Sequence, residues 1–242
     1  MNRNTLIKST LTITAMFTLL GCGNGNHNIE KPNPGNDNST PSALPQEIDD
    51  AIQSPHSSLT QELKDSIAYM YSEESLAHDI YLEIYTIQPL KQLKNIANNS
   101  ETKHIEAVNA MAVKYDLNMT QYPDTDIPYS INGIEVGNYP VDNVQYLYDL
   151  LYSKGIASEK EALEVGCMVE VVDIDDLDTY IVQAETSNAP DVLDIFNFLR
   201  NGSYTHYWAF DKGLKNRDVA EGCCSVPPAL GHNFCHPEYP KK

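Results

Sequence analysis

Hydrophobic residues recur at helical spacing along four long segments of the chain, and in each segment acidic residues or histidines interrupt the apolar stripe near its middle. Steps of three and four residues are typical of a helix that buries one face. The pattern predicts four long helices over residues 59–87, 90–116, 158–186 and 190–212, and one shorter helix over residues 142–154. We therefore expect an all-α fold in which four long helices pack around a common interior.

The polar residues inside these stripes should face that interior. They are Glu74, Glu101, His104, Glu170, Asp173 and His206. Buried carboxylates are costly unless cations lie among them, and the middles of antiparallel helices meet at the same height. The set therefore predicts a metal site, although each residue alone has an ordinary explanation as a solvated flank or a core histidine. Glu73 lies about 100° around the helix from Glu74 and is expected to face away from the core.

Length and charge narrow the choice of partners. The 242 residues carry a net charge of −18, and this length suits one folded domain with appendages. A strongly acidic surface argues against nucleic acid as a partner and against charge-driven binding to anionic headgroups.

The first 21 residues are typical of a targeting segment, because a basic start precedes an apolar stretch too short to span a bilayer. The stretch ends in Leu19-Leu20-Gly21-Cys22, which resembles the lipobox of bacterial lipoproteins. In that pattern the cysteine is lipidated and begins the mature chain. The resemblance implies a lipid-anchored protein of the bacterial cell envelope, facing the periplasm or the exterior, with the membrane as its partner. An ordinary secretory signal with an incidental cysteine is the alternative.

Composition divides the chain into parts. We expect a signal peptide at 1–21, a disordered tether at 22–58, the folded helices at 59–213 and a Cys- and Pro-rich tail at 214–242. The tether is rich in Asn, Pro, Ser and Gly and cannot bury enough apolar surface to offset the entropy of ordering. Residues 117–141 form a long crossing connection. Asn98, Asn99 and Ser100 are poor helix formers directly before Glu101, which predicts a local distortion of the helix there.

Four cysteines follow Cys22, namely Cys167, Cys223, Cys224 and Cys235. In an exported protein disulfides are the default, and four cysteines allow three pairings. Adjacent cysteines rarely bond to each other, so we favour a bond from Cys223 or Cys224 to Cys235, with Cys167 as a buried thiol. A soft-metal site at His232, Cys235 and His236 is the alternative, but it lacks a second ligand pair at convincing spacing.

Several motifs carry a family resemblance. Glu74-Ser75-Leu76-Ala77-His78 followed by Glu101-Thr102-Lys103-His104 is similar to the first ligand pair of rubrerythrins. With Gly166-x-x-x-Glu170-x-x-Asp173, and Arg200-Asn201-Gly202-Ser203 before His206, the chain resembles an exported bacterial family of ferritin-like domains of unknown function, of the DUF2202 type. The resemblance covers about residues 59–213. It implies a ferritin-like four-helix bundle with a long crossover between the second and third helices that contains the short extra helix.

The same resemblance implies metal roles for Glu74, Glu101, His104, Glu170 and His206. One position departs from the ferritin pattern, because Ser203 stands where a Glu would precede the histidine. Asp173 is the candidate replacement for that carboxylate. Glu101 and one carboxylate of the third helix would bridge the ions, and each histidine would ligate one of them.

These features favour a carboxylate-bridged pair of divalent metal ions, iron in the first place and manganese as the alternative. Oxidase, ferroxidase or peroxide-reducing activity would then be expected. The electron donor would be external, because the chain has no rubredoxin-like Cys-x-x-Cys pair. A non-catalytic surface lipoprotein or interaction module, whose metal is structural or absent, is the alternative, and a homodimer is left open. A hydrolase finds no support, because Ser203 and His206 lack an orienting acid.

Overall fold

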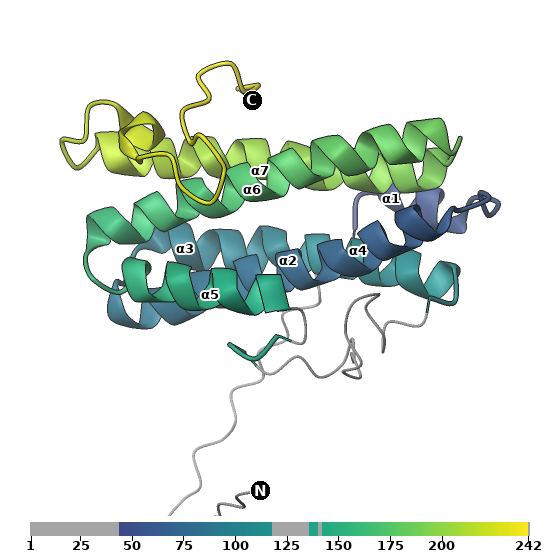
Figure 1. Cartoon of the computed structure of the whole chain (residues 1–242), viewed down its shortest axis with the longest axis horizontal. Helices are drawn as coiled ribbons and strands as arrows, with labels where there is room; N and C mark the ends of the chain where they lie inside the picture. The colour runs from purple at the N-terminus through teal and green to yellow at the C-terminus, as the bar shows by residue number, and fades with distance from the viewer. Residues whose placement is uncertain (1–43, 118–135, 140–141, 242) are drawn as a thin grey trace, which may run out of the picture. The chain divides into compact units, whose positions relative to one another are not determined.

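The computed structural model describes residues 44–117, 136–139 and 142–241, and within them it contains helices and no strands (Figure 1). The α-helices are α1 (Gln46–Gln53), α2 (Gln61–Ile87), α3 (Lys91–Ile96), α4 (Thr102–Lys114), α5 (Asp142–Gly155), α6 (Glu159–Thr186) and α7 (Pro190–Lys215). A π-helical turn, η1 (Ala97–Glu101), joins α3 to α4, and a 3-10 turn, η2 (Gly222–Ser225), follows α7. The predicted all-α fold is confirmed, with α3, η1 and α4 together forming the second predicted helix. None of the described helices combines the length and the apolar character needed to cross a membrane.

The long helices begin where side chains replace the missing backbone partners of the first turn. The hydroxyl of Thr60 accepts a hydrogen bond from the N–H of Leu63 at 3.2 Å, and that of Ser158 accepts one from the N–H of Glu161 at 3.2 Å. Ser158 also donates to the carboxylate of Glu161 at 2.8 Å, so Ser158 caps the N-terminus of α6. Pro190 opens α7 at a position where its missing N–H has no helical partner to lose.

Two apolar cores lie at different heights along the long helices. The first contains residues within 76–84 of α2, 93–97 of α3 and η1, 162–174 of α6 and 207–214 of α7. The second contains residues within 63–71 of α2, 107–112 of α4, 177–184 of α6 and 192–199 of α7. The order in which each helix meets the two cores gives its direction. Helices α4 and α6 therefore run in the same direction, and α2 and α7 run antiparallel to them. The polar residues of the four stripes lie between the two cores, in what we call the polar layer.

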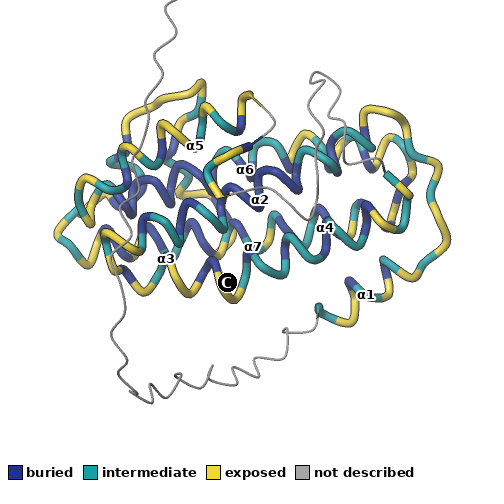
Figure 2. Tube along the Cα trace, turned by 90° about the horizontal axis from the view of Figure 1, so that it is seen from below, coloured by how far each residue is buried: buried dark blue, intermediate teal, exposed yellow. Residues whose placement is uncertain are grey.

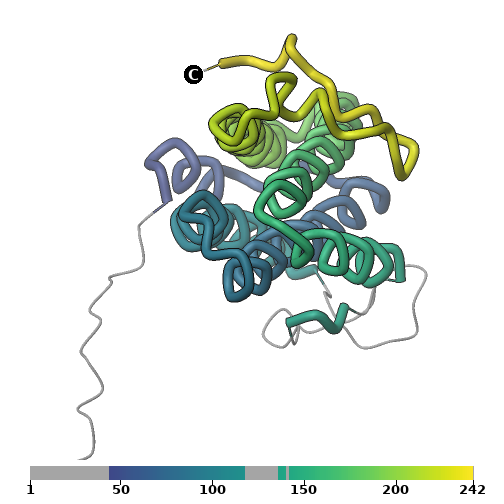
Figure 3. Tube along the Cα trace, turned by 90° about the vertical axis from the view of Figure 1, so that its left-hand side faces the viewer, coloured from purple at the N-terminus to yellow at the C-terminus, as the bar shows by residue number. Residues whose placement is uncertain are grey.

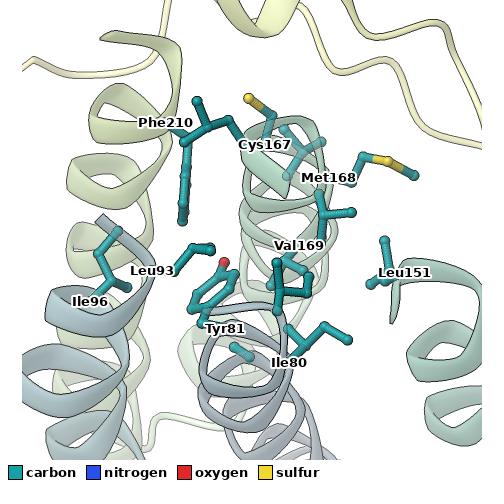
Figure 4. Close-up of a cluster of buried hydrophobic side chains, with 14 of the residues drawn as sticks. Ile80, Tyr81, Leu93, Ile96, Leu151, Cys167, Met168, Val169 and Phe210 are labelled. Atoms are coloured by element: carbon teal, nitrogen blue, oxygen red, sulfur yellow. The ribbon is translucent and has the colours of Figure 1, made fainter. Parts of the chain in front are cut away.

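The first core closes one side of the polar layer with large side chains. Tyr81 of α2 lies among Leu93, Ile96, Val169 and Phe210, which come from α3, α6 and α7 (Figure 4). The ring centroids of Tyr81 and Phe210 are 5.2 Å apart, a distance at which aromatic pairs contribute beyond their buried area. Both rings are fully buried, so this side of the polar layer excludes water.

The short helix α5 packs on the outside of α2 and α6 (Figure 3). It covers the face of α2 that carries Glu73, and Leu147 of α5 lines a small cavity together with Glu73 and Val169. The side chain of Glu73 is therefore buried, with the residue 6 % exposed, and the prediction that it faces away from the interior is wrong. Helical spacing gives the face on which a residue lies but not the neighbour that covers that face.

The folded part begins earlier than the composition predicts. Residues 46–53, assigned to the disordered tether, form α1, and its Ile48 and Ala51 are buried in the second core (Figure 2). The hydroxyl of Ser57 donates a hydrogen bond to Asp191 at the start of α7, at 2.6 Å. Apolar contacts of Ile48 and Ala51, together with hydrogen bonds from Lys114 to the carbonyl of Ala51 and to Ser54, dock α1, although the segment around it is polar. The earlier part of the tether, the signal peptide with Cys22 and most of the crossing connection lie outside the described residues.

The C-terminal tail, drawn in yellow, lies against α6 and α7 (Figure 1). One disulfide bonds it to α6, and a second closes a loop within the tail. Cys167 of α6 is bonded to Cys223, with 5.6 Å between the Cα atoms, and Cys224 is bonded to Cys235. The predicted bond to Cys235 is confirmed. The prediction of a free thiol at Cys167 is wrong, because the tail folds back over α6 and brings Cys223 to it. The second disulfide also removes Cys235 as a thiolate ligand for the alternative soft-metal site.

Candidate metal centre

Five of the six predicted ligands form two clusters within the polar layer. They are Glu74 from α2, Glu101 from η1, His104 from α4, Glu170 from α6 and His206 from α7. Each of these residues is at most 4 % exposed. Such a concentration of buried ionisable groups is costly unless the groups neutralise one another or a bound ion.

Among the described residues, two groups of Glu and His have ligand atoms close enough to hold a metal ion, and they share Glu101. In the first group, Nδ1 of His104 lies 3.0 Å from Oε2 of Glu74 and 3.0 Å from Oε2 of Glu101. In the second, Nδ1 of His206 lies 3.0 Å from Oε1 of Glu101 and 3.3 Å from Oε2 of Glu170. The two oxygens of Glu101 therefore face different histidines, as expected of a carboxylate that bridges two ions.

The π-helical turn η1 places Glu101 at this central position. Such turns are rare within helices and occur frequently at functional sites. Oγ of Ser100, in the same turn, lies 2.7 Å from Nε2 of His206. This contact fixes the ring so that its Nδ1 faces the carboxylates. The distortion predicted at Asn98, Asn99 and Ser100 is confirmed, and it lies next to the residue that the two clusters share.

The protonation of the site follows from the closeness of these groups. Burial alone would lower the pKa of both histidines, but Glu74 and Glu101 raise that of His104 well above its usual value, and Glu101 and Glu170 raise that of His206 to about 10. Burial raises the pKa of Glu74 to about 7 against the opposing effect of His104. Burial also acts to raise the pKa of Glu101, but the two histidines lower it below its usual range. Protons on the histidines therefore neutralise the carboxylates when no metal ion does.

The donor set fits divalent cations. Oε1 of Glu74 is buried and has no hydrogen-bond partner among the described residues, and an unsatisfied buried carboxylate oxygen is costly. A cation between Glu74, Glu101 and His104 would satisfy that oxygen and replace the histidine proton. Carboxylate oxygen together with imidazole nitrogen suits first-row divalent metals without selecting one of them. The two clusters can therefore hold metal ions.

Tyr81 orients the ligand from α6. Its hydroxyl donates a short hydrogen bond to Oε1 of Glu170, whose other oxygen faces His206. Burial raises the pKa of Tyr81 well above its usual value, and the nearby carboxylates add to this effect. Tyr81 therefore stays protonated and remains a donor.

Asp173 belongs to neither cluster. It lies in the polar layer on α6, where its Oδ2 accepts a hydrogen bond from Oγ of Ser203 at 2.6 Å. Burial raises the pKa of Asp173 well above its usual value, with Glu74 contributing in the same direction. The serine that departs from the ferritin pattern thus binds the carboxylate suggested as its replacement.

Sequence reasoning missed three residues that support the ligands, namely Tyr81, Ser100 and Gly202. Gly202 lies one turn before His206, and a Cβ added there would be 2.3 Å from Nε2 of His104. Only a residue without a side chain allows α7 to approach that ring so closely. Its position in the apolar stripe of α7 was the available signal, because a glycine there suggests a close helix contact.

The family model described as "Uncharacterized protein domain (DUF2202)" matches residues 63–222, which is more than half of the chain. The chain belongs to the DUF2202 family. The matched region contains all five residues of the two clusters.

Outside the family model, "Uncharacterized protein MJ0754" from Methanocaldococcus jannaschii is 32 % identical over 162 residues, which are 67 % of this chain and 80 % of that protein. The crystal structure of this hypothetical protein superimposes with a TM-score of 0.60 and covers 69 % of this chain and 87 % of its own. Neither name assigns an activity. The DUF2202 family is thus established for this chain, while its chemistry has to be argued from the site.

Proposed function

We propose that the chain is a ferritin-like protein whose long helices bind two divalent metal ions, iron in the first place, bridged by Glu101. The observation that carries this proposal is the sharing of Glu101 between the two clusters. The helix directions support it, because α4 and α6 run in the same direction and a connection of 44 residues, which contains α5, separates them along the chain, as in ferritin-like bundles.

Each helix contributes a defined part of the proposed centre. Glu74 and His104 would hold one ion, and Glu170 and His206 the other. Glu101 would contact both through its two oxygens. The side chains that hold the ligands in place are Ser100 behind His206 and Tyr81 behind Glu170.

Two ferrous ions held there would supply the electrons that reduce dioxygen or peroxide, giving oxidase, ferroxidase or peroxide-reducing activity. The surrounding residues would exclude water, since the first core closes the layer with Tyr81 and Phe210. Asp173 holds a proton at its carboxyl group beside Ser203, because its pKa is raised by burial.

Metal content tests this proposal. Purified protein loaded with ferrous ion under argon should bind about two ions per chain. Glu101→Gln should lose most of them, since it removes the shared charge. Glu73→Gln is the matched control, because Glu73 is also a buried glutamate of this region but belongs to neither cluster. Full occupancy in Glu101→Gln, or equal loss in both variants, would exclude the proposed centre.

Reaction with oxidant separates the catalytic function from its alternative. The reduced, loaded protein should change its absorbance when mixed with dioxygen or peroxide. A loaded protein that does not react, but unfolds at a higher temperature than the metal-free form, would support a structural metal in a non-catalytic surface lipoprotein or interaction module.

We propose further that the protein is tethered to the bacterial envelope through a lipid on Cys22. The support is the similarity of Leu19-Leu20-Gly21-Cys22 to a lipobox. Cys22→Ser should move the protein from the membrane fraction to the soluble fraction, and unchanged membrane retention would refute the tether.

A further inference from the structure

A cavity lies on the outer face of α7, where Pro240 and Lys241 of the C-terminal tail pass beside Trp208. Its volume is about 350 Å³, a size that suits a small organic ligand. Its lining residues are Thr205, Trp208, Asp211, Lys212, Lys215 and Lys241. None of them belongs to the two Glu and His clusters.

Trp208 forms a fixed apolar wall of this cavity. Its Nε1 donates a hydrogen bond to the carbonyl of Pro240 at 3.0 Å, which ties α7 to the tail. Its ring meets that of Tyr207 edge to face, with 5.2 Å between the centroids. The ammonium group of Lys241 lies 4.0 Å from the centroid of the indole, within the range of a cation–π contact. This wall of the cavity therefore combines an aromatic surface, which its neighbours fix in position, with a positive charge.

The cavity is positively charged although the chain as a whole carries −18. Lys215 is paired with Asp211, with 2.8 Å between Nζ and Oδ2. Lys212 and Lys241 form no salt bridge with any carboxylate in the described part of the chain. The negative end of the α7 dipole accounts for lysines in its last turn, such as Lys212 and Lys215. It does not account for Lys241, which comes from the tail.

We propose that this cavity binds a small organic anion with an aromatic or otherwise apolar body. The ammonium groups of Lys212 and Lys241 would bind the anionic group, and the body would pack against Trp208. The long stems of the lysines add apolar surface around the opening. Specificity would be for a carboxylate or phosphate attached to a flat group, rather than for an inorganic anion.

Trp208 is the single tryptophan of the chain, so the tryptophan fluorescence of the protein comes from the wall of this cavity. Phenyl phosphate is a suitable probe. Inorganic phosphate, which carries only the charged group, and benzyl alcohol, which carries only the aromatic group, are the controls. Phenyl phosphate should change the fluorescence in a saturable way, and inorganic phosphate and benzyl alcohol should each bind at least about tenfold more weakly. Binding should be the same with and without metal ions, which separates this site from the proposed metal centre.

Substitutions of single lysines complete the test. Lys212→Gln and Lys241→Gln should each weaken phenyl phosphate binding by about tenfold, the usual effect of losing a charged hydrogen-bond partner. Lys91→Gln, which removes an exposed lysine on α3, is the matched control and should bind normally. The proposal is overturned if no saturable change occurs, if inorganic phosphate binds as tightly, or if the three variants behave alike. A fluorescence blue shift with phosphatidylglycerol vesicles but not with phenyl phosphate would also overturn it, because it would assign the surface to a membrane.

Discussion

Replacing Gly202 by alanine tests whether the close approach of α7 holds His104 in place. The new Cβ would lie 2.3 Å from Nε2 and 2.5 Å from Cε1 of that ring. Ordinary contact between such atoms begins at about 3.5 Å, so the ring or the helix must move by about 1 Å. The ring has little freedom, because its Nδ1 is 3.0 Å from both Glu74 and Glu101 and Phe198 meets it edge-on, with 5.4 Å between centroids.

Two effects on stability oppose each other in this variant. Alanine in a helix interior favours folding by about 1 kcal/mol relative to glycine. Overpacking a buried site costs about 1–3 kcal/mol. We therefore expect the metal-free protein to lose about 0–2 kcal/mol. The effect on metal should be larger, because disturbing the residues that support a ligand typically lowers metal affinity about 10–100-fold. It should fall on the cluster that contains His104.

Isothermal titration with manganous ion, together with urea unfolding, measures both quantities. Gly213→Ala is the matched control on the same helix. Its new Cβ would lie 3.0 Å from Cδ2 of Leu163 and 3.2 Å from Nε2 of Gln92, which are the ends of side chains that can move. The control should keep the affinity for both ions. If Gly202→Ala also keeps it, the reasoning that Gly202 positions His104 is refuted.

Three further predictions concern charge and covalent links. The metal-free protein should lose stability from about pH 5 to 8, because the raised pKa of Glu74, about 7, and of both site histidines makes the folded state bind more protons than the unfolded state. Manganous ion should reverse that trend in thermal unfolding, and coincident curves at every pH would contradict it. Burial acts to raise the pKa of Asp191, but Lys114 at 2.6 Å and other hydrogen-bond donors lower it overall. The ionised Asp191 therefore stabilises the folded protein above about pH 4, and this contribution is lost at lower pH. Asp191→Asn should lower the free energy of unfolding by about 3–5 kcal/mol at neutral pH, because Lys114 stays buried without a counter-ion, and by less in acid. Urea unfolding that finds an equal loss at pH 3 and pH 7 would disprove the pairing. Cys167→Ser should destabilise by about 4 kcal/mol and Cys235→Ser by about 3, because their bonds span separations of 56 and 11 residues; calorimetry that finds the reverse order would exclude this account.

The sequence alone predicted every helix from α2 to α7 and placed the candidate ligands on buried faces, but it missed α1 and the burial of Glu73. Steps of three and four residues place Glu74, Glu101, Glu170 and His206 in the middle of apolar stripes, and a helix of fixed pitch leaves each residue only one direction to face. Because the polar residues lie near the middle of each helix, antiparallel packing brings them to the same level along the bundle. The distortion before Glu101 was also readable, because Asn and Ser disfavour the regular helix.

Only the tertiary structure decided what covers each face and which distant groups meet. Spacing could not show that α5 buries Glu73, or that the tail brings Cys223 to Cys167, because both contacts join segments far apart in the chain. The same holds for the hydrogen bond from Ser203 to Asp173 and for the approach of Gly202 to His104. Local periodicity determines the direction of a side chain, whereas the partner it meets depends on how whole helices pack, and that packing is set by all the buried contacts together.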